Sequence, residues 1–269
     1  MYYSLLALAV IKFTLACPRH DFGIHNNVIG KRAAHDKDWS YETSFNWGKI
    51  NADYTACQTG TNQSPIPLTL TQGISQVHIP IFNYGTPIAG NVYNWEHGPS
   101  FTADTNATPL TQGPSMTFDN QTLYFQGWHI HAPADHSIQG ERSKAELHLV
   151  HANAYNITRA VVAILIDPGN VDSAFASQFI NAPCPSFNST DSIPVPNMDL
   201  SLAIREAGNF AEFWTYDGSL TSPPCTEGVR FFVSRSVMTV SNKQMQDILR
   251  VSTFSARREQ EVWLHSINI

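Results

Sequence analysis

The sequence predicts a mostly β protein of the α+β class, with short helices around a sheet and a single domain. Three observations support this prediction. The 16 prolines and 15 glycines interrupt the chain at short intervals, which is typical of short strands joined by turns. Several segments alternate apolar and polar residues, and one is continuously apolar. From Trp39 onward, no linker, repeat or low-complexity block divides the chain.

Four segments have the patterns of strands. Residues 122–132 (TLYFQGWHIHA) alternate and are rich in aromatic side chains, and residues 145–152 (AELHLVHA) alternate cleanly. Residues 160–166 (AVVAILI) form a continuous apolar run, which predicts a strand buried on both faces. Residues 229–237 (VRFFVSRSV) predict a fourth strand.

One segment has the clear pattern of a helix, residues 241–251 (SNKQMQDILRV). Ser241 is the expected N-cap, and Gln244 three residues later completes a capping box. Met245, Ile248 and Leu249 form an apolar stripe that we expect to face the core.

The N-terminal residues predict secretion. Residues 1–16 form a signal peptide with an apolar run of about a dozen residues, too short to span a bilayer, and Thr14 and Ala16 precede the expected cut. We expect residues 17–37 to be a flexible leader and residues 38–269 to be the folded domain. The basic pair at residues 31–32 is read as an exposed surface pair, with a dibasic processing site as the alternative. These features predict an extracellular protein without a membrane-spanning segment.

The charge pattern excludes nucleic acid as a partner. The expected secretory route makes the cysteines candidates for disulfides and the Asn-x-Ser/Thr triplets candidates for glycosylation. The net charge is -6, charged residues make up 14%, and no Lys/Arg run is present, so nucleic-acid binding has no electrostatic basis. In an oxidising compartment the 4 cysteines are candidates for disulfides. Pro65 makes Asn62 a poor glycan acceptor. The candidate glycosylation sites are Asn106, Asn120, Asn156 and Asn188.

Histidines are concentrated between residues 127 and 151, in the first two predicted strands. His129 and His131 project from one face of their strand because residues i and i+2 point the same way. On the next strand Glu146, His148 and Val150 share a face. If the two strands pair antiparallel, His129, His131 and His148 converge, and three imidazoles with one open position are the ligand set of a catalytic zinc site.

The remaining residues of this stretch have other expected roles. We read His136, in the loop after the first strand, and His151, which faces away from His148, as structural hydrogen-bonding residues. A metal-binding imidazole needs a partner on its second nitrogen, and Glu146 or another carboxylate is placed to supply one. A cupin also carries His-x-His followed by a carboxylate, for which Asp135 is placed, so the histidine spacing alone leaves that fold open.

Two further motifs decide between these alternatives. The segments HIH (129–131) and AELHLVH (145–151), together with YDGSLTSPPCTEGV (216–229) and NQSPI (62–66), closely resemble the α-class carbonic anhydrases of the secreted eukaryotic type. The resemblance extends from WSY (39–41) nearly to the C-terminus. It implies a single domain on a central twisted, mainly antiparallel sheet, with zinc at the bottom of a conical cleft.

The resemblance also implies a function and a set of site residues. It implies reversible hydration of carbon dioxide to bicarbonate and a proton, by attack of zinc-bound hydroxide. Positions that match the family's motifs suggest zinc ligands at His129, His131 and His148, with Glu146 as hydrogen-bond partner of the third. Thr221 and Asp135 match the pair that orients the nucleophile, Val150, Val161, Leu220 and Ser222 match the substrate pocket, and His97 is the candidate proton shuttle. Tyr41 and Ser64 fall in matching stretches near the cleft.

The resemblance implies one disulfide and leaves two cysteines open. Cys57 and Cys225 match a disulfide of many extracellular members, which would tie the N-terminal part to the loop carrying Thr221. Cys17 and Cys184 then pair within the chain, link a homodimer, or remain free thiols. The partners expected otherwise are the small-molecule substrate alone, with neither nucleic acid nor membrane.

Four positions depart from the family pattern. Asp135 stands where the family has glutamate, Gly127 where a glutamine orients the first ligand, and Phe231 where the pocket has tryptophan. Residues 255–260 (SARREQ) replace an Asn-x-Arg-Pro-x-Gln stretch, so Arg257 keeps only part of that role. These departures predict turnover below that of fast members. The alternatives to the zinc enzyme are a carbonic-anhydrase-like binding module with weak or no activity, and a cupin-like protein that uses iron or manganese.

Overall fold

The computed structural model describes residues 38–180, 184–187 and 189–269. The predicted signal peptide, leader and processing pair, with Cys17 and Asn188, lie outside the described residues. The strands are β1 (Ile81–Asn83), β2 (Ile88–Asn94), β3 (Pro99–Ala103), β4 (Ser115–Phe118), β5 (Gln121–His131), β6 (Ala145–Ala152), β7 (Thr158–Gly169), β8 (Ser192–Met198), β9 (Phe213–Ser219), β10 (Glu227–Ser234) and β11 (Met238–Ser241).

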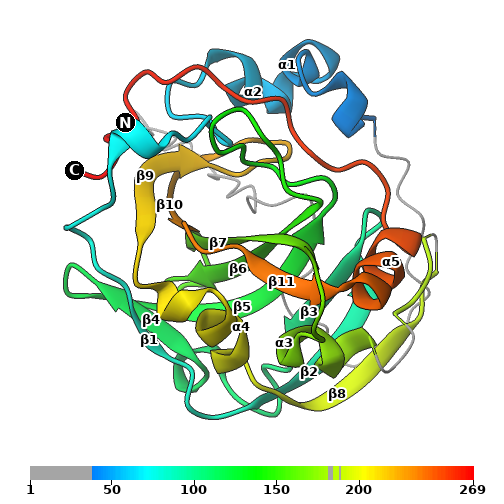
Figure 1. The fold of residues 1–269 in the computed structure, drawn as a ribbon. Helices are drawn as coiled ribbons and strands as arrows, with labels where there is room; N and C mark the ends of the chain where they lie inside the picture. The colour runs from blue at the N-terminus through cyan, green and yellow to red at the C-terminus, as the bar shows by residue number, and fades with distance from the viewer. Residues whose placement is uncertain (1–37, 181–183, 188) are drawn as a thin grey trace, which may run out of the picture.

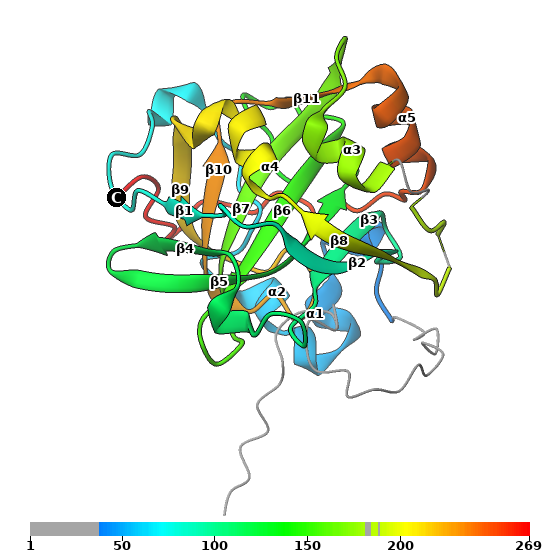
Figure 2. The same cartoon turned by 90° about the horizontal axis from the view of Figure 1, so that it is seen from below.

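The helices are short, as predicted. They are α1 (Trp47–Ile50), α2 (Ala56–Thr59), α3 (Ala174–Ile180), α4 (Ser201–Glu206) and α5 (Asn242–Arg250), with single 3₁₀ turns η1 (Tyr41–Thr43), η2 (Ala52–Tyr54), η3 (Leu70–Gln72), η4 (Leu110–Gln112) and η5 (Gly208–Phe210). Figures 1 and 2 show α3, α4 and α5 together on one side of the sheet, and α1 and α2 on the opposite side near the C-terminal segment.

The strands form one 11-stranded sheet, which confirms the predicted mostly β fold. The strand order of its main path is β8-β2-β3-β5-β6-β7-β10-β9, with β4 beside β5, β1 beside β4 and β11 beside β7. Most pairs are antiparallel, but β7 pairs in parallel with β10 and β11. The continuous apolar run at residues 160–166 lies in β7, which is central and buried along this length, because both faces of the strand are covered.

The side chains of β5 and β6 point alternately to the two faces of the sheet, and a buried layer covers each face. Trp128, Leu147 and Leu149 belong to the larger apolar cluster, which also takes in side chains of α3, α4 and α5. The residues between them in sequence point to the other face of the sheet. There a smaller cluster contains Trp214 and Phe231 among its members. His129, His131 and His148 lie on this second face.

Two details of the predicted elements are wrong. β10 ends at Ser234, so residues 235–237 are not in the strand. In α5 the capping box of Ser241 and Gln244 forms as predicted, and Met245 and Ile248 are buried. Leu249, however, is 39% exposed, because its position is one residue beyond Ile248 and turns about 100° away from the core.

Candidate metal centre

Three histidines meet on the second face of the sheet. Strands β5 and β6 pair antiparallel with His129 opposite His148 and His131 opposite Glu146. The ring centroids lie 4.6 to 5.2 Å apart, and one ligand atom from each histidine falls within 4.8 Å of the others. All three side chains are buried. The predicted convergence of the three imidazoles is therefore present in the structure.

The hydrogen bonds leave ring nitrogens of His131 and His148 turned toward the cluster. Nδ1 of His131 donates to the carbonyl of Ser255 at 2.7 Å, and Nε2 of His148 donates to Glu146 Oε1 at 2.8 Å. Nε2 of His129 and Nε2 of His131 lie 3.0 Å apart. Two nitrogens on one tetrahedral Zn²⁺ lie about 3.3 Å apart, as follows from Zn–N bonds of about 2.05 Å. The donor set and its spacing thus fit a zinc ion.

Charge and burial prepare these groups to bind a cation. Burial lowers the pKa of His131, which keeps its imidazole neutral and its lone pair available. Burial alone would raise the pKa of Glu146, but the charge and hydrogen bond of His136 and the hydrogen bond of His148 hold it well below its ordinary value. Glu146 is therefore ionised and raises the basicity of His148 through their hydrogen bond.

His136 has a closer connection to the centre than its loop position suggested. Its Nδ1 donates to Glu146 Oε1 at 2.6 Å and its backbone N–H donates to Glu146 Oε2 at 2.7 Å. Its Nε2 is hydrogen-bonded to the hydroxyl of Tyr216 at 2.7 Å. His136 is hydrogen-bonded, as predicted, and it supplies hydrogen bonds to both carboxylate oxygens of Glu146. The signal in the sequence was slight: His136 directly follows Asp135, and Tyr216 lies 80 residues away on β9.

Asp135 and Thr221 are both buried, but they do not meet directly. Asp135 Oδ1 accepts from the backbone N–H of Arg257 at 2.8 Å, and Asp135 Oδ2 lies 3.5 Å from His131 Nε2. Oδ2 has no hydrogen-bond partner, and no hydrogen bond joins the two described residues Asp135 and Thr221. The shorter aspartate side chain therefore does not make the contact that the resemblance implied.

Arg257 is fully buried and connects the loop of Thr221 to the N-terminal part of the chain. Its guanidinium donates to the carbonyls of Ser64 at 2.6 Å and Leu220 at 3.3 Å, and to Gln63 Oε1 at 2.8 Å. It also lies over the ring of Trp47 at 5.3 Å. Burial lowers the pKa of Arg257 to about 10, so it remains a cation at neutral pH. Sequence reasoning gave Arg257 only part of a role and missed these contacts.

The disulfide lies in the same region. Cys57 in α2 is bonded to Cys225, which follows Thr221 by four residues. The carbonyl of Cys57 accepts from Arg257 Nη2 at 3.3 Å. The predicted disulfide is thus confirmed, and together with Arg257 it joins the Thr221 loop to the N-terminal helices.

The apolar residues expected to form a substrate pocket lie on the face of the sheet that carries the three histidines. Val150 is paired with Val161 across β6 and β7, and both are buried. Val161 and Leu220 belong to the same apolar cluster as Phe231. Phe231 stacks on Tyr216 and lies with its ring centroid 5.8 Å from that of His148. Ser222 is also buried, directly after Thr221.

His97 is half-buried in an aromatic environment near the cluster. Its ring centroid lies 5.0 Å from that of Tyr41 and 4.8 Å from that of Trp95. Its Nδ1 lies 2.9 Å from the hydroxyl of Thr253. The rings of Tyr41 and Trp95 also pack against His131, so His97 shares two neighbours with the metal cluster.

Fold and site together define a protein of the carbonic anhydrase type. A family model described as eukaryotic-type carbonic anhydrase matches residues 42–266, and the chain belongs to this enzyme family. The chain is 30% identical over 211 residues to a carbonic anhydrase of Klebsiella pneumoniae, covering 77% of this chain and 80% of the relative.

Solved structures agree with this assignment. An α-carbonic anhydrase of Thermovibrio ammonificans in complex with sulfanilamide superposes with a TM-score of 0.72 at 23% identity, covering 87% of this chain and 99% of the other, which shows the shared fold. A carbonic anhydrase of Chlamydomonas reinhardtii in complex with acetazolamide has a TM-score of 0.66 at 27% identity, covering 80% of this chain and 93% of that one.

Proposed function

We propose that this chain catalyses the reversible hydration of carbon dioxide to bicarbonate and a proton, with Zn²⁺ held by His129, His131 and His148. The observation that supports this most is the meeting of three buried imidazoles within a chain of the carbonic anhydrase family. Zn²⁺ at such a site acidifies a coordinated water and so supplies a nucleophile near neutral pH, as is established for carbonic anhydrases as a class.

The hydrogen bonds of the chain orient the ligands. Ser255 fixes the ring of His131 through its backbone carbonyl, and Glu146 fixes the ring of His148. His136 and Tyr216 fix Glu146 in turn. Gly127 has no side chain and so contributes nothing to the orientation of His129.

The remaining residues act on the substrate and the proton. Val150, Val161 and Leu220 provide an apolar surface suited to uncharged carbon dioxide, with the hydroxyl of Ser222 beside it. Thr221 orients the attacking group, and Asp135 acts on Thr221 through a longer path than direct contact. His97 transfers the proton to buffer, because an imidazole titrates near neutral pH and this one shares neighbours with His131.

The experiment that tests this function measures bound metal and CO2 hydration in the same sample. We expect about one zinc per chain, a hydration rate that acetazolamide abolishes, and loss of both on chelation with recovery on return of zinc. Zinc bound without hydration would favour the binding module. The cupin-like alternative is excluded by the carbonic anhydrase fold and family match, so iron or manganese in place of zinc would contradict only the proposed metal.

We also propose that the chain is secreted and glycosylated. Support comes from the disulfide, since such bonds persist in oxidising compartments. Asn106 and Asn120 lie in turns and are exposed, whereas Asn156 is half-buried and its Oδ1 accepts from Gln126 at 2.7 Å. Glycans are therefore expected first at Asn106 and Asn120. Among the described residues, no helix has the length and apolar character needed to cross a membrane.

A disulfide-linked homodimer through Cys184 or Cys17 gains no support from the structure. Cys184 is a free thiol that packs partly against the large apolar cluster. Burial raises the pKa of its thiol to about 12, which disfavours the thiolate needed for disulfide exchange. The partner for which the site is suited is a small molecule.

A further inference from the structure

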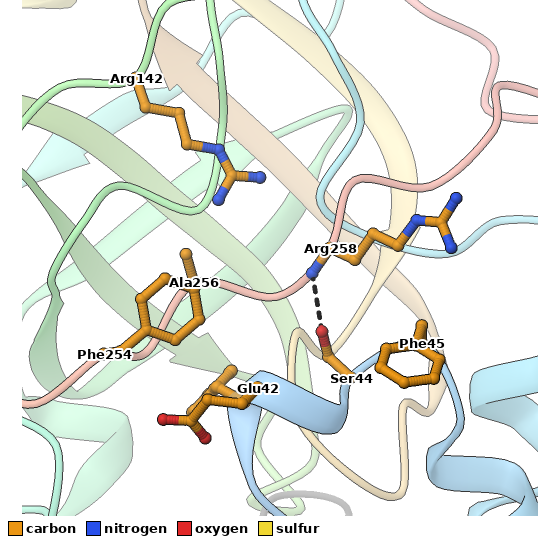
Figure 3. A pocket seen from close by; sticks show the side chains of 8 residues that line it. Glu42, Ser44, Phe45, Arg142, Phe254, Ala256 and Arg258 are labelled. Atoms are coloured by element: carbon orange, nitrogen blue, oxygen red, sulfur yellow. Dashed lines mark hydrogen bonds between the residues drawn. The ribbon is translucent and has the colours of Figure 1, made fainter.

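A pocket outside the metal centre lies between three segments that are distant in sequence. It has a volume of about 370 Å³ and is bounded by η1 and the residues after it, by Arg142 in the loop between β5 and β6, and by the C-terminal segment. The lining residues are Tyr41, Glu42, Ser44, Phe45, Arg142, Phe254, Ala256 and Arg258 (Figure 3). Its size is in the range of small-molecule sites, about 300 to 1,000 Å³.

The apolar part of this pocket is aromatic and open to solvent. The side chains of Phe45 and Phe254 are 55% and 45% exposed, although phenyl rings of this kind usually lie in the core. Ala256 lies beside Phe254 and adds an apolar surface. Exposed aromatic rings around a hollow mark a surface that gains free energy when another apolar group covers it.

The charged part of the pocket favours an anion. Its lining holds two arginines and one glutamate, a net charge of +1. Arg142 Nη2 makes one long hydrogen bond, 3.3 Å, to the carbonyl of Arg257, and the backbone N–H of Arg258 donates to Ser44. Across the described parts of the chain, neither guanidinium forms an ion pair; the arginines that do are Arg230, Arg235 and Arg250. Figure 3 shows the guanidinium of Arg142 directed toward the space beside Ala256 and Arg258.

We propose that this pocket binds small aromatic monocarboxylates, with the carboxylate on Arg142 and the ring against Phe254 and Phe45. A planar guanidinium matches a carboxylate through two parallel hydrogen bonds, and the single excess positive charge matches one carboxylate. Aromatic rings pack on phenyl rings with a gain beyond simple burial. This proposal goes beyond the proposed CO2 chemistry and does not depend on it.

The pocket is separate from the metal centre but shares one wall with it. None of the three clustered histidines lines it. Tyr41 does, and its ring centroid lies 6.0 Å from that of His131 and 5.0 Å from that of His97. A ligand that fills the metal centre therefore leaves the pocket available, and the two sites can be tested independently.

The test uses the holoprotein with its metal site saturated by acetazolamide, titrated with 4-fluorobenzoate and followed by ¹⁹F NMR. We expect saturable binding with a dissociation constant in the range of about 1 mM. Arg142→Met should weaken it about tenfold or more, because a hydrogen-bonded charge pair is lost. The matched control is Lys144→Met, which removes an exposed positive charge two residues away outside the pocket and should leave the constant unchanged.

A second variant tests the aromatic contact, and a neutral probe tests the need for the carboxylate. Phe254→Ser, at an exposed position, should also weaken binding, and 4-fluorobenzamide should bind about tenfold more weakly than the acid. Absence of saturable binding, or equal loss in Arg142→Met and Lys144→Met, would overturn the proposal. Since binding is the readout, a result against the pocket is distinct from a result against CO2 hydration.

Discussion

Strand β6 carries two buried histidines three residues apart, which the sheet directs to opposite faces. His148 faces two other imidazoles and the ionised Glu146. His151 faces the apolar cluster, where its Nε2 accepts from Tyr84 at 2.5 Å and burial lowers its pKa to about 3. Burial lowers the pKa of His151 on one face and of His131 on the other, so both faces carry a neutral imidazole. The difference in function therefore comes from the partners. On one face a carboxylate and the lone pairs of two other imidazoles form a cation site, whereas on the other face the hydroxyl of Tyr84 only completes the hydrogen bonding of a buried histidine.

The largest expected effect separates these two histidines directly. His148→Ala should abolish zinc binding and reduce CO2 hydration to the uncatalysed rate. The variant keeps only two of the three imidazole ligands, which bind zinc weakly. His151→Leu should leave zinc content and turnover unchanged. Metal analysis and a hydration assay on both variants measure this contrast, and retention of zinc by His148→Ala would contradict the assignment.

The next effect concerns the partner of His148. Glu146→Gln removes the charge that raises the basicity of His148, and zinc affinity should fall about 10- to 100-fold. Competition with a chromophoric chelator measures the affinity. Glu141→Gln, at an exposed position in the neighbouring loop, is the matched control and should bind zinc as the unmodified chain does. Equal affinity in the two variants would show that Glu146 supplies only packing.

A smaller effect is expected on the Asp135 side. Asp135→Glu adds the methylene that a direct hydrogen bond to Thr221 requires, and CO2 hydration should rise about tenfold, the equivalent of about 1.4 kcal/mol. The same change in a Thr221→Val background should give no increase. An unchanged rate in Asp135→Glu would mean that the missing contact does not limit turnover.

The last effect is on stability in acid, lies outside the metal centre, and concerns His151. Its pKa is about 3 in the folded chain against an ordinary value of 6.5, so the unfolded chain binds more protons below pH 6.5. The free energy of unfolding is therefore unaffected by the titration of His151 above pH 6.5. Below it, this titration lowers the free energy of unfolding by up to about 1.4 kcal/mol per pH unit until pH 3. Urea unfolding between pH 7 and 4 should give a shallower loss for His151→Leu, and parallel curves would contradict this.

The sequence was informative where one local pattern determined the geometry. Alternation in β5 and β6 placed three imidazoles on one face, because a two-residue period leaves no other choice once the strands pair. The contact of His136 with Tyr216 joins a loop to β9 and has no periodic signal. The hydrogen bond from His131 goes to a backbone carbonyl, which any residue at position 255 would offer.

Two other features could not have been predicted for different reasons. Arg257 is a buried cation, against the usual preference of arginine for the surface, and its acceptors come from three parts of the chain, at Cys57, at residues 63–64 and at Leu220, that only the folded chain brings to it. The separation of Asp135 and Thr221 depends on a single methylene and on backbone positions. Neither the spacing nor the composition of the sequence encodes such distances.

The bond between Cys57 and Cys225 spans 168 positions and so makes the chain a covalent ring with two tails. All three clustered histidines and Thr221 lie inside the ring, whereas Arg257 lies on the C-terminal tail. A protease that cuts once within the exposed turn at residues 139–141 would open the ring without dividing the molecule. Such a nicked chain should migrate as one species on a non-reducing gel and as two fragments after reduction.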